Sequence, residues 1–174
     1  SISLSNSVTH IGDYAFDCCK SLTEVLFPKN VASIGKNVFL GCESLENIIV
    51  EDGNQNYVVV DGILCDKAKT HLIKCPQKTD LTEYVIPNTI TKIEDNAFYF
   101  FSSIQSTIIP NSVTSIGSSA FEGTSLEHVI IPSSVVSIGV RAFDINKLNS
   151  VKIDAIEPPI IGHYAIYNSA IIFI

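Results

Sequence analysis

A pattern of about 23 residues recurs along the chain, and this repetition constrains the fold more than any other feature of the sequence. A clear copy reads approximately Ser-Val-x-x-Ile-Gly-x-x-Ala-Phe, followed by a polar stretch, an apolar run and a proline. The copies occupy residues 6–28, 29–51, 88–110, 111–132, 133–154 and, more loosely, 155–174, with an interruption at 52–87. A period of this length is typical of solenoids, in which each unit stacks on its neighbours.

Three positions of the repeat are apolar in all five clear copies. The columns are Val8, Val31, Ile90, Val113 and Val135; Ile11, Ile34, Ile93, Ile116 and Ile138; and Phe16, Phe39, Phe98, Phe121 and Phe143. A single unit is too small to bury these side chains, so the units must stack around one continuous core. With 46% hydrophobic residues, the 174-residue chain is expected to form a single domain of this kind.

The second half of each copy predicts a short β-strand. Apolar β-branched residues recur two positions apart, as in Val129 and Ile131, and Pro132 ends the run. The alanine before each phenylalanine suits a short helical turn. A glycine follows the second apolar column, where we expect a corner with positive φ; these glycines are Gly12, Gly35, Gly117 and Gly139. We therefore predict a mainly β solenoid of short parallel strands with short helical turns.

The interruption contains a predicted β-hairpin over residues 57–76. Apolar and polar residues alternate on both sides of a lysine-rich turn near Ala68. The hairpin could project as a docking element, but we favour a variant coil that fills the same volume.

The form SVxxIGxxAFxxCxSLxxIxIP resembles the BspA-type leucine-rich repeat, a family found on the surfaces of oral and gut bacteria and expanded in parasitic protists. The interruption is similar to the segment that replaces part of a coil in that family. The family's cysteine is present at Cys19 and Cys42 but is replaced by Phe101 later in the chain. The resemblance implies a curved leucine-rich-repeat solenoid with a role in adhesion or protein recognition and no catalytic residues.

Charge and composition exclude several function classes. The formal net charge is −7, and no basic cluster is present, which argues against nucleic acid or anionic lipid as a partner. No apolar stretch of about 20 residues occurs, so membrane insertion within this segment is not expected. The chain opens and closes within the repeat pattern, and we expect it to be a fragment of a longer array with caps outside this segment.

Candidate metal and catalytic groups are dispersed along the sequence. The four histidines, His10, His71, His128 and His163, fall in different units, and no CxxC pair occurs. Residues 52–56 lack the alternating carboxylates of a calcium loop and are interpreted as a turn. We therefore expect no enzyme activity, no metal site and no cofactor.

The five cysteines are an odd number, which argues against a fully paired disulfide framework. Cys19 and Cys42 share a column and are interpreted as small buried hydrophobic residues. A bond between Cys65 and Cys75 requires a hairpin register that brings them together.

The outer face of the strands is the candidate partner-binding surface. We expect two outward-pointing columns there: Glu24, Asn47, Ser106, His128 and Ser150, and Leu26, Ile49, Ile108, Ile130 and Lys152. The second column is apolar in four units of five, and contiguous exposed apolar surface often marks a partner site. Alternatively, strand propensity alone selects these residues, or a flanking segment covers them.

Two functions remain open. The first is an adhesion module, at the cell surface or secreted, that binds a host or matrix protein. The second is a cytoplasmic scaffold or structural piece that docks against neighbouring subunits, which the unpaired cysteine count mildly favours.

Overall fold

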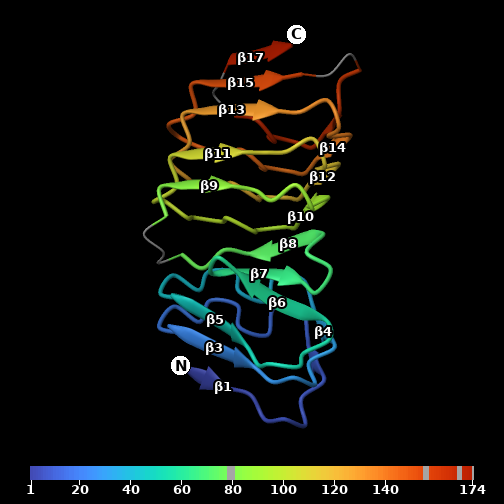
Figure 1. Cartoon of the computed structure of the whole chain (residues 1–174). Coiled ribbons are helices and arrows are strands. Elements are labelled where there is room, and N and C mark those ends of the chain that lie inside the picture. Colours follow the sequence, from blue (N-terminus) through green and yellow to red (C-terminus); the bar gives the residue numbers. More distant parts are fainter. Residues whose placement is uncertain (78–80, 155–156, 168–169, 174) are drawn as a thin grey trace.

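The computed structural model describes residues 1–77, 81–154, 157–167 and 170–173. The chain winds into a β-solenoid of about seven turns, with the N-terminus at one end and the C-terminus at the other (Figure 1). No helix occurs among these residues. The predicted repeat solenoid is therefore confirmed, without its helical turns.

One side of the solenoid carries the strands that the sequence predicts. They form parallel groups, which are β1 (Ile2–Ser3), β3 (Glu24–Phe27) and β5 (Asn47–Val50); β9 (Glu83–Val85) and β11 (Ser106–Ile108); and β13 (His128–Ile131), β15 (Ser150–Ile153) and β17 (Ala170–Phe173). Equivalent residues of successive coils pair directly, as Val25 does with Ile48 and Val129 with Val151. The repeat period thus sets the strand register.

A second side carries shorter strands at the second apolar column. They are β2 (His10–Ile11) and β4 (Ser33–Ile34) in one pair, and β10 (Lys92–Ile93), β12 (Ser115–Ile116), β14 (Ser137–Ile138) and β16 (Ile160–Ile161) in a longer sheet.

The phenylalanine column forms a stacked core. Phe98, Phe121 and Phe143 have no exposed surface. The ring centroids of Phe98 and Phe121 are 4.9 Å apart, and those of Phe121 and Phe143 are 5.2 Å apart. The planes of neighbouring rings are nearly parallel, at interplanar angles of 6° and 7°. Stacking adds to the free energy gained by burial.

The turns between the two strand-bearing sides are not helical because their amides alternate between two kinds of partner. In the first coil the N–H of Ala15 donates within the turn to Gly12 O, whereas the N–H of Phe16 donates to Val38 O of the next coil. A helix would use every amide internally. Here every other amide bonds to the next coil instead, so the hydrogen bonds that join the strands of successive coils continue through the turns.

The prediction of positive φ at the repeat glycines is wrong. Positive φ falls two positions later in each coil, at Tyr14, Asn37, Asn96, Ser119, Arg141 and Tyr164. Most of the glycines are needed for a different reason, which is the close approach of the preceding coil. A Cβ built at Gly139 would lie 2.4 Å from the backbone nitrogen of Ser118.

The interruption forms three antiparallel strands rather than two. They are β6 (Tyr57–Val60), β7 (Ile63–Asp66) and β8 (His71–Lys74), and β8 joins β10 in parallel. Leu64 packs into the N-terminal core, whereas Ile63 and Cys65 pack into a separate C-terminal core. The segment therefore fills the volume of a coil, as favoured from the sequence, and divides the interior in two.

The register does not allow a Cys65–Cys75 disulfide in this segment. The register places Cys65 opposite Leu72 rather than Cys75, and all five cysteines are free. Cys42 is buried as expected, while Cys19 is only partly buried.

Candidate protein-binding surfaces

The outer strand face presents the two columns that the sequence predicts. In the first column Asn47, Ser106 and His128 are exposed, and Glu24 and Ser150 are partly exposed. In the second column Ile49, Ile108 and Ile130 are 43%, 55% and 56% exposed, and Leu26 and Lys152 are partly exposed. The predicted outward orientation is correct for all ten residues.

Val85 extends the apolar column, and sequence reasoning missed it. It is 56% exposed and pairs with Ile108, and Glu83 beside it is exposed and pairs with Ser106. Both residues fell inside the interruption, although residues 81–87 (LTEYVIP) match 104–110 (IQSTIIP) at a step of 23. That match could have identified them.

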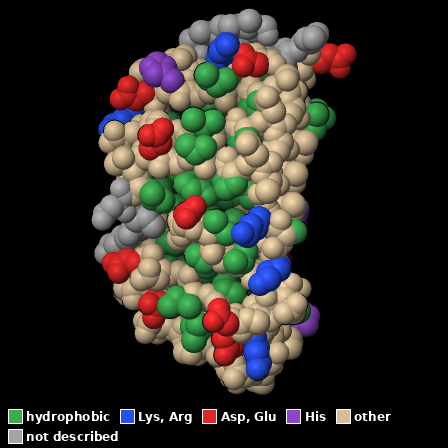
Figure 2. Space-filling model, in the orientation of Figure 1, with side chains coloured by type: hydrophobic (Ala, Val, Ile, Leu, Met, Phe, Trp, Pro, Cys, Tyr) green, Lys and Arg blue, Asp and Glu red, His purple; other side chains and the backbone are tan. Residues whose placement is uncertain are grey.

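Hydrophobic side chains form a band along this face, with charged side chains beside it and at a few places within it (Figure 2). The apolar residues of the strand-face column are Leu26, Ile49, Val85, Ile108 and Ile130. At the C-terminal end the column changes to Lys152, which forms an ion pair of 3.0 Å with Asp154. His128 and Ser150 are joined by a hydrogen bond of 2.8 Å in the polar column. The face thus combines an apolar centre with polar groups able to form hydrogen bonds.

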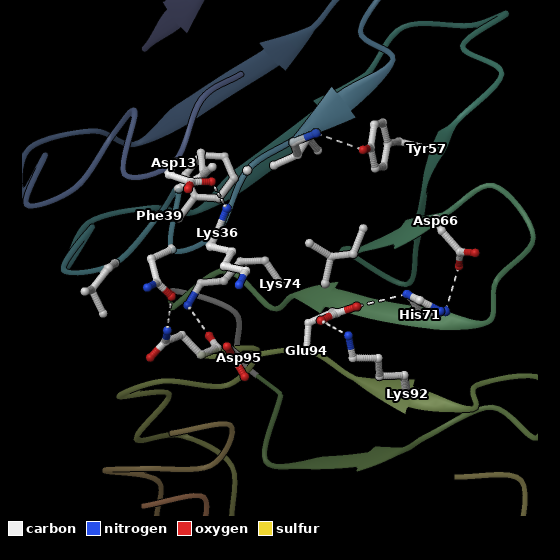
Figure 3. A pocket seen from close by; sticks show the side chains of 17 residues that line it. Asp13, Lys36, Phe39, Tyr57, Asp66, His71, Lys74, Lys92, Glu94 and Asp95 are labelled. Carbon is white, nitrogen blue, oxygen red and sulfur yellow. Dashed lines mark hydrogen bonds and ion pairs between the residues drawn. The ribbon is translucent and has the colours of Figure 1, made fainter. Parts of the chain in front are cut away.

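A cleft of about 500 Å³ lies on the other side of the coils, where the interruption replaces a regular turn (Figure 3). Its lining comes from Asp13 of the first coil, from residues 34–40 of the second coil, from the inserted segment, and from Lys92 and residues 94–96. Tyr57 bridges part of the gap, because its hydroxyl accepts a hydrogen bond from the N–H of Ile34 at 2.9 Å. The sequence contained no pattern that predicts this cleft.

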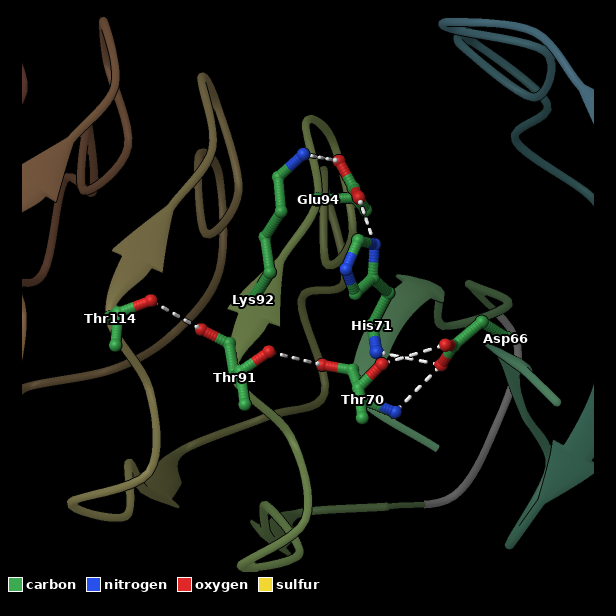
Figure 4. Close-up of polar contacts among 7 residues, drawn as sticks. All are labelled: Asp66, Thr70, His71, Thr91, Lys92, Glu94 and Thr114. Atoms are coloured by element: carbon green, nitrogen blue, oxygen red, sulfur yellow. Dashed lines mark hydrogen bonds and ion pairs between the residues drawn. The ribbon is translucent and has the colours of Figure 1, made fainter. Parts of the chain in front are cut away.

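Charged groups on one wall of the cleft hold one another in place (Figure 4). The Asp66 carboxylate accepts hydrogen bonds from the N–H groups of Thr70 and His71, each at 2.7 Å, and these hydrogen bonds lower its pKa although burial opposes them. Glu94 contacts His71 Nδ1 at 2.9 Å and Lys92 Nζ at 2.8 Å. These carboxylates are already engaged by protein groups.

Lys74 is buried beside this wall, with 4% of its surface exposed. Its Nζ donates a hydrogen bond of 3.0 Å to the carbonyl oxygen of Asn96. Burial lowers the pKa of the Lys74 ammonium to about 8. A buried charge of this kind is costly to folding unless a partner compensates it.

The described residues offer little for catalysis or metal binding. They contain no group of three or more histidine, cysteine, aspartate or glutamate side chains placed to hold a metal ion. Burial raises the pKa of the Cys42 and Cys65 thiols to about 11, so both remain protonated at neutral pH and are poor nucleophiles. Within the same residues, no helix is suited to crossing a bilayer.

Solved structures of bacterial leucine-rich repeat proteins share this architecture. A leucine-rich repeat protein from Eubacterium ventriosum is 28% identical, with a TM-score of 0.82 over 90% of this chain and 42% of that protein. The pneumococcal vaccine antigen PcpA is 24% identical, with a TM-score of 0.74 over 96% of this chain and 49% of that protein. A leucine rich cell surface protein from Faecalibacterium prausnitzii is 24% identical, with a TM-score of 0.62 over 86% of this chain and 52% of that protein.

The chain is therefore a leucine-rich-repeat solenoid that spans about half the length of these proteins. The BspA type leucine rich repeat region matches residues 1–58 and 74–174 in six copies, and the chain belongs to this family. No curated protein matches it. The repeat family indicates a protein-interaction or surface-protein module.

Proposed function

We propose that this chain is a non-catalytic adhesion module, at the cell surface or secreted, that recognises a host or matrix protein through its strand face. The observation that carries the proposal is the exposed apolar strip of Val85, Ile108 and Ile130 on the neighbouring strands β9, β11 and β13. Strand propensity alone would explain single exposed isoleucines, but three exposed apolar side chains on successive strands supply contiguous apolar area for a partner.

The proposed binding residues are those of the two columns. The apolar members, Leu26, Ile49, Val85, Ile108 and Ile130, would supply the buried centre of an interface, and Glu24, Asn47, Ser106 and His128 would supply hydrogen bonds beside it. The acidic net charge of −7 favours partners with basic surfaces.

A second candidate is a cytoplasmic scaffold, in which the same face docks against neighbouring subunits. The five free thiols favour this alternative, because unpaired cysteines persist most readily in a reducing compartment.

Binding assays with matched variants separate the candidates. The immobilised chain is exposed to a panel of purified matrix proteins and to lysate of the producing cell, alongside Ile130→Glu and Val136→Glu. Val136 is 63% exposed but lies next to β14 on the other side of the solenoid, so it controls for the added charge. The adhesion proposal predicts capture of a matrix protein that only Ile130→Glu loses. Capture of subunits from the cell's own lysate, with no matrix protein bound, would favour the scaffold.

A further inference from the structure

The coils are linked by a regular row of amide hydrogen bonds in their turns. In the first coil the N–H groups of Tyr14, Phe16 and Cys18 donate to carbonyl oxygens of the second coil at 2.8 to 3.0 Å. Equivalent donors recur at Asn96, Phe98 and Phe100; at Ser119, Phe121 and Gly123; and at Arg141 and Phe143. In these turns every second N–H group therefore donates a hydrogen bond to a carbonyl oxygen of the next coil.

The second coil breaks this row. Its equivalent N–H groups belong to Asn37, Phe39 and Gly41, and none of them has an acceptor among the residues that the structure describes. The cause is the insertion, since β6 and β7 replace the turn that would have supplied the carbonyls. Asn37 and Phe39 line the cleft, so these donors border its space.

The opposite wall supplies a donor of another kind, a buried ammonium without a paired carboxylate among the described residues. Lys74 lines the cleft, and its Nζ has one acceptor, the carbonyl oxygen of Asn96. No carboxylate in the described part of the chain forms an ion pair with it. Figure 3 shows Lys74 between the second coil, with Lys36 and Phe39, and Glu94, which directly follows β10.

The acidic side chains of the cleft do not compensate this charge. Asp66 and Glu94 already form the hydrogen bonds and ion pairs described above. Asp13 Oδ1 accepts a hydrogen bond from the N–H of Lys36, and Asp95 Oδ1 accepts one from the N–H of Ser118, both at 2.7 Å. Within the described ranges, two backbone amides spaced two residues apart therefore lack acceptors at the cleft, and the Lys74 ammonium has one acceptor but no paired carboxylate.

We propose that this cleft is a second binding site, which takes an extended acidic segment of a partner protein. Main-chain carbonyls of the segment accept hydrogen bonds from Asn37 and Phe39 in place of the absent turn, as in peptide binding at a sheet edge. An Asp or Glu carboxylate of the segment pairs with the Lys74 ammonium. A cleft of about 500 Å³ holds a few residues of such a chain.

The site is independent of the strand face. The residues of the cleft come from the turns, the inserted segment and the short strands β4 and β10, whereas Ile108 and Ile130 lie in β11 and β13. A partner could therefore occupy one surface without the other, and variants separate the two.

A displayed library of random heptapeptides, panned against the native chain, tests the proposal. Selected peptides are measured by titration calorimetry against the native chain, Lys74→Met, Lys20→Met and Ile130→Glu. Lys20 is an exposed residue of the first coil that pairs with Glu43 and does not line the cleft, so its variant removes the same charge outside the site. We expect enrichment of Asp or Glu, at least a tenfold loss of affinity in Lys74→Met, and changes below twofold in the other two variants.

Amide exchange provides the second readout. Bound peptide should slow exchange of the Asn37 and Phe39 N–H groups. Replacing an accepting peptide carbonyl by a methylene group, or removing the peptide carboxylate, should weaken binding. Three results would each overturn the proposal: no enriched peptide, equal affinity for Lys74→Met in a folded variant, or full competition by millimolar inorganic phosphate, which would indicate a small-anion site instead.

Discussion

Asn37 and Asn96 lie 59 positions apart in sequence, and Asn96 Nδ2 donates a hydrogen bond of 2.6 Å to Asn37 Oδ1. Both residues occupy the same place in their coils and have positive φ, at 55° and 58°. The contact crosses the interruption and links the N-terminal coils to the C-terminal coils, two stacks of coils that have separate hydrophobic cores. The cleft lies between these two residues' coils.

A double-mutant cycle measures this link. Asn37→Gly and Asn96→Gly keep positive φ free of strain, so the cycle isolates the side-chain contact. We expect a coupling energy of about 1 kcal/mol in urea unfolding at neutral pH. Additive single and double changes would mean that the two stacks do not communicate through this bond.

The phenylalanine stack makes core truncation costly. Phe121 lies between Phe98 and Phe143 with no exposed surface, and Phe121→Ala leaves a cavity at an interior coil. We expect a loss of about 3 to 5 kcal/mol in the free energy of unfolding. Ile130→Glu is the control and should change it by less than about 1 kcal/mol. Comparable losses in both variants would contradict the inward and outward assignment.

Two glycines at the same repeat position should respond differently to alanine. A Cβ at Gly139 would meet backbone atoms of Gly117 and Ser118 at 2.4 to 2.7 Å, whereas a Cβ at Gly12 meets nothing within 4 Å. Gly139→Ala should destabilise the chain by about 1 to 3 kcal/mol, as overpacking does. Gly12→Ala should be neutral or stabilising by up to about 1 kcal/mol. Thermal unfolding of both variants checks this, and equal costs would show that backbone conformation, not close approach, requires the glycines.

Lys74 should reduce stability in a pH-dependent way. Its pKa falls from 10.5 to about 8 on folding because burial disfavours the ammonium. Between these pH values the unfolded chain binds more protons, so this group makes stability rise with pH, and its cost is fully present below pH 8. Lys74→Met removes the cost and should raise the free energy of unfolding at pH 7, on the order of 1 to 3 kcal/mol.

That gain should shrink as the pH approaches 10.5. Urea unfolding of the native chain and Lys74→Met at pH 7 and pH 10 measures the difference, in which the titration of Cys65 cancels because both chains carry this thiol and Lys74 does not act on it. A variant that is less stable at pH 7, or a difference that does not change with pH, would show that the ammonium is compensated in the folded chain.

The repeat pattern made most of the architecture predictable. Columns such as Phe98 and Phe121 must face inward because nothing else in a unit can form a core, and the alternation in each strand then places Ile108 and Ile130 outward. Val85 was missed only because its unit begins inside the interruption.

Other features could not be predicted because they depend on contacts between coils. A glycine can be required in a repeat because its φ is positive or because another coil lies too close for a side chain, and the sequence looks the same in both cases. At Gly139 only the position of the preceding coil shows that the second reason applies. The cleft beside Lys74 arises from hydrogen bonds that the second coil cannot form, and no residue pattern in its own sequence records that loss.

The most direct test of the proposed function is the affinity of the native chain, Ile130→Glu and Val136→Glu for a panel of purified matrix proteins, measured by surface plasmon resonance. Recognition through the strand face predicts that the native chain and Val136→Glu bind the same matrix protein, while Ile130→Glu binds it at least tenfold more weakly with an unchanged Tm. Equal binding by all three, or no binding to any protein of the panel, would contradict it.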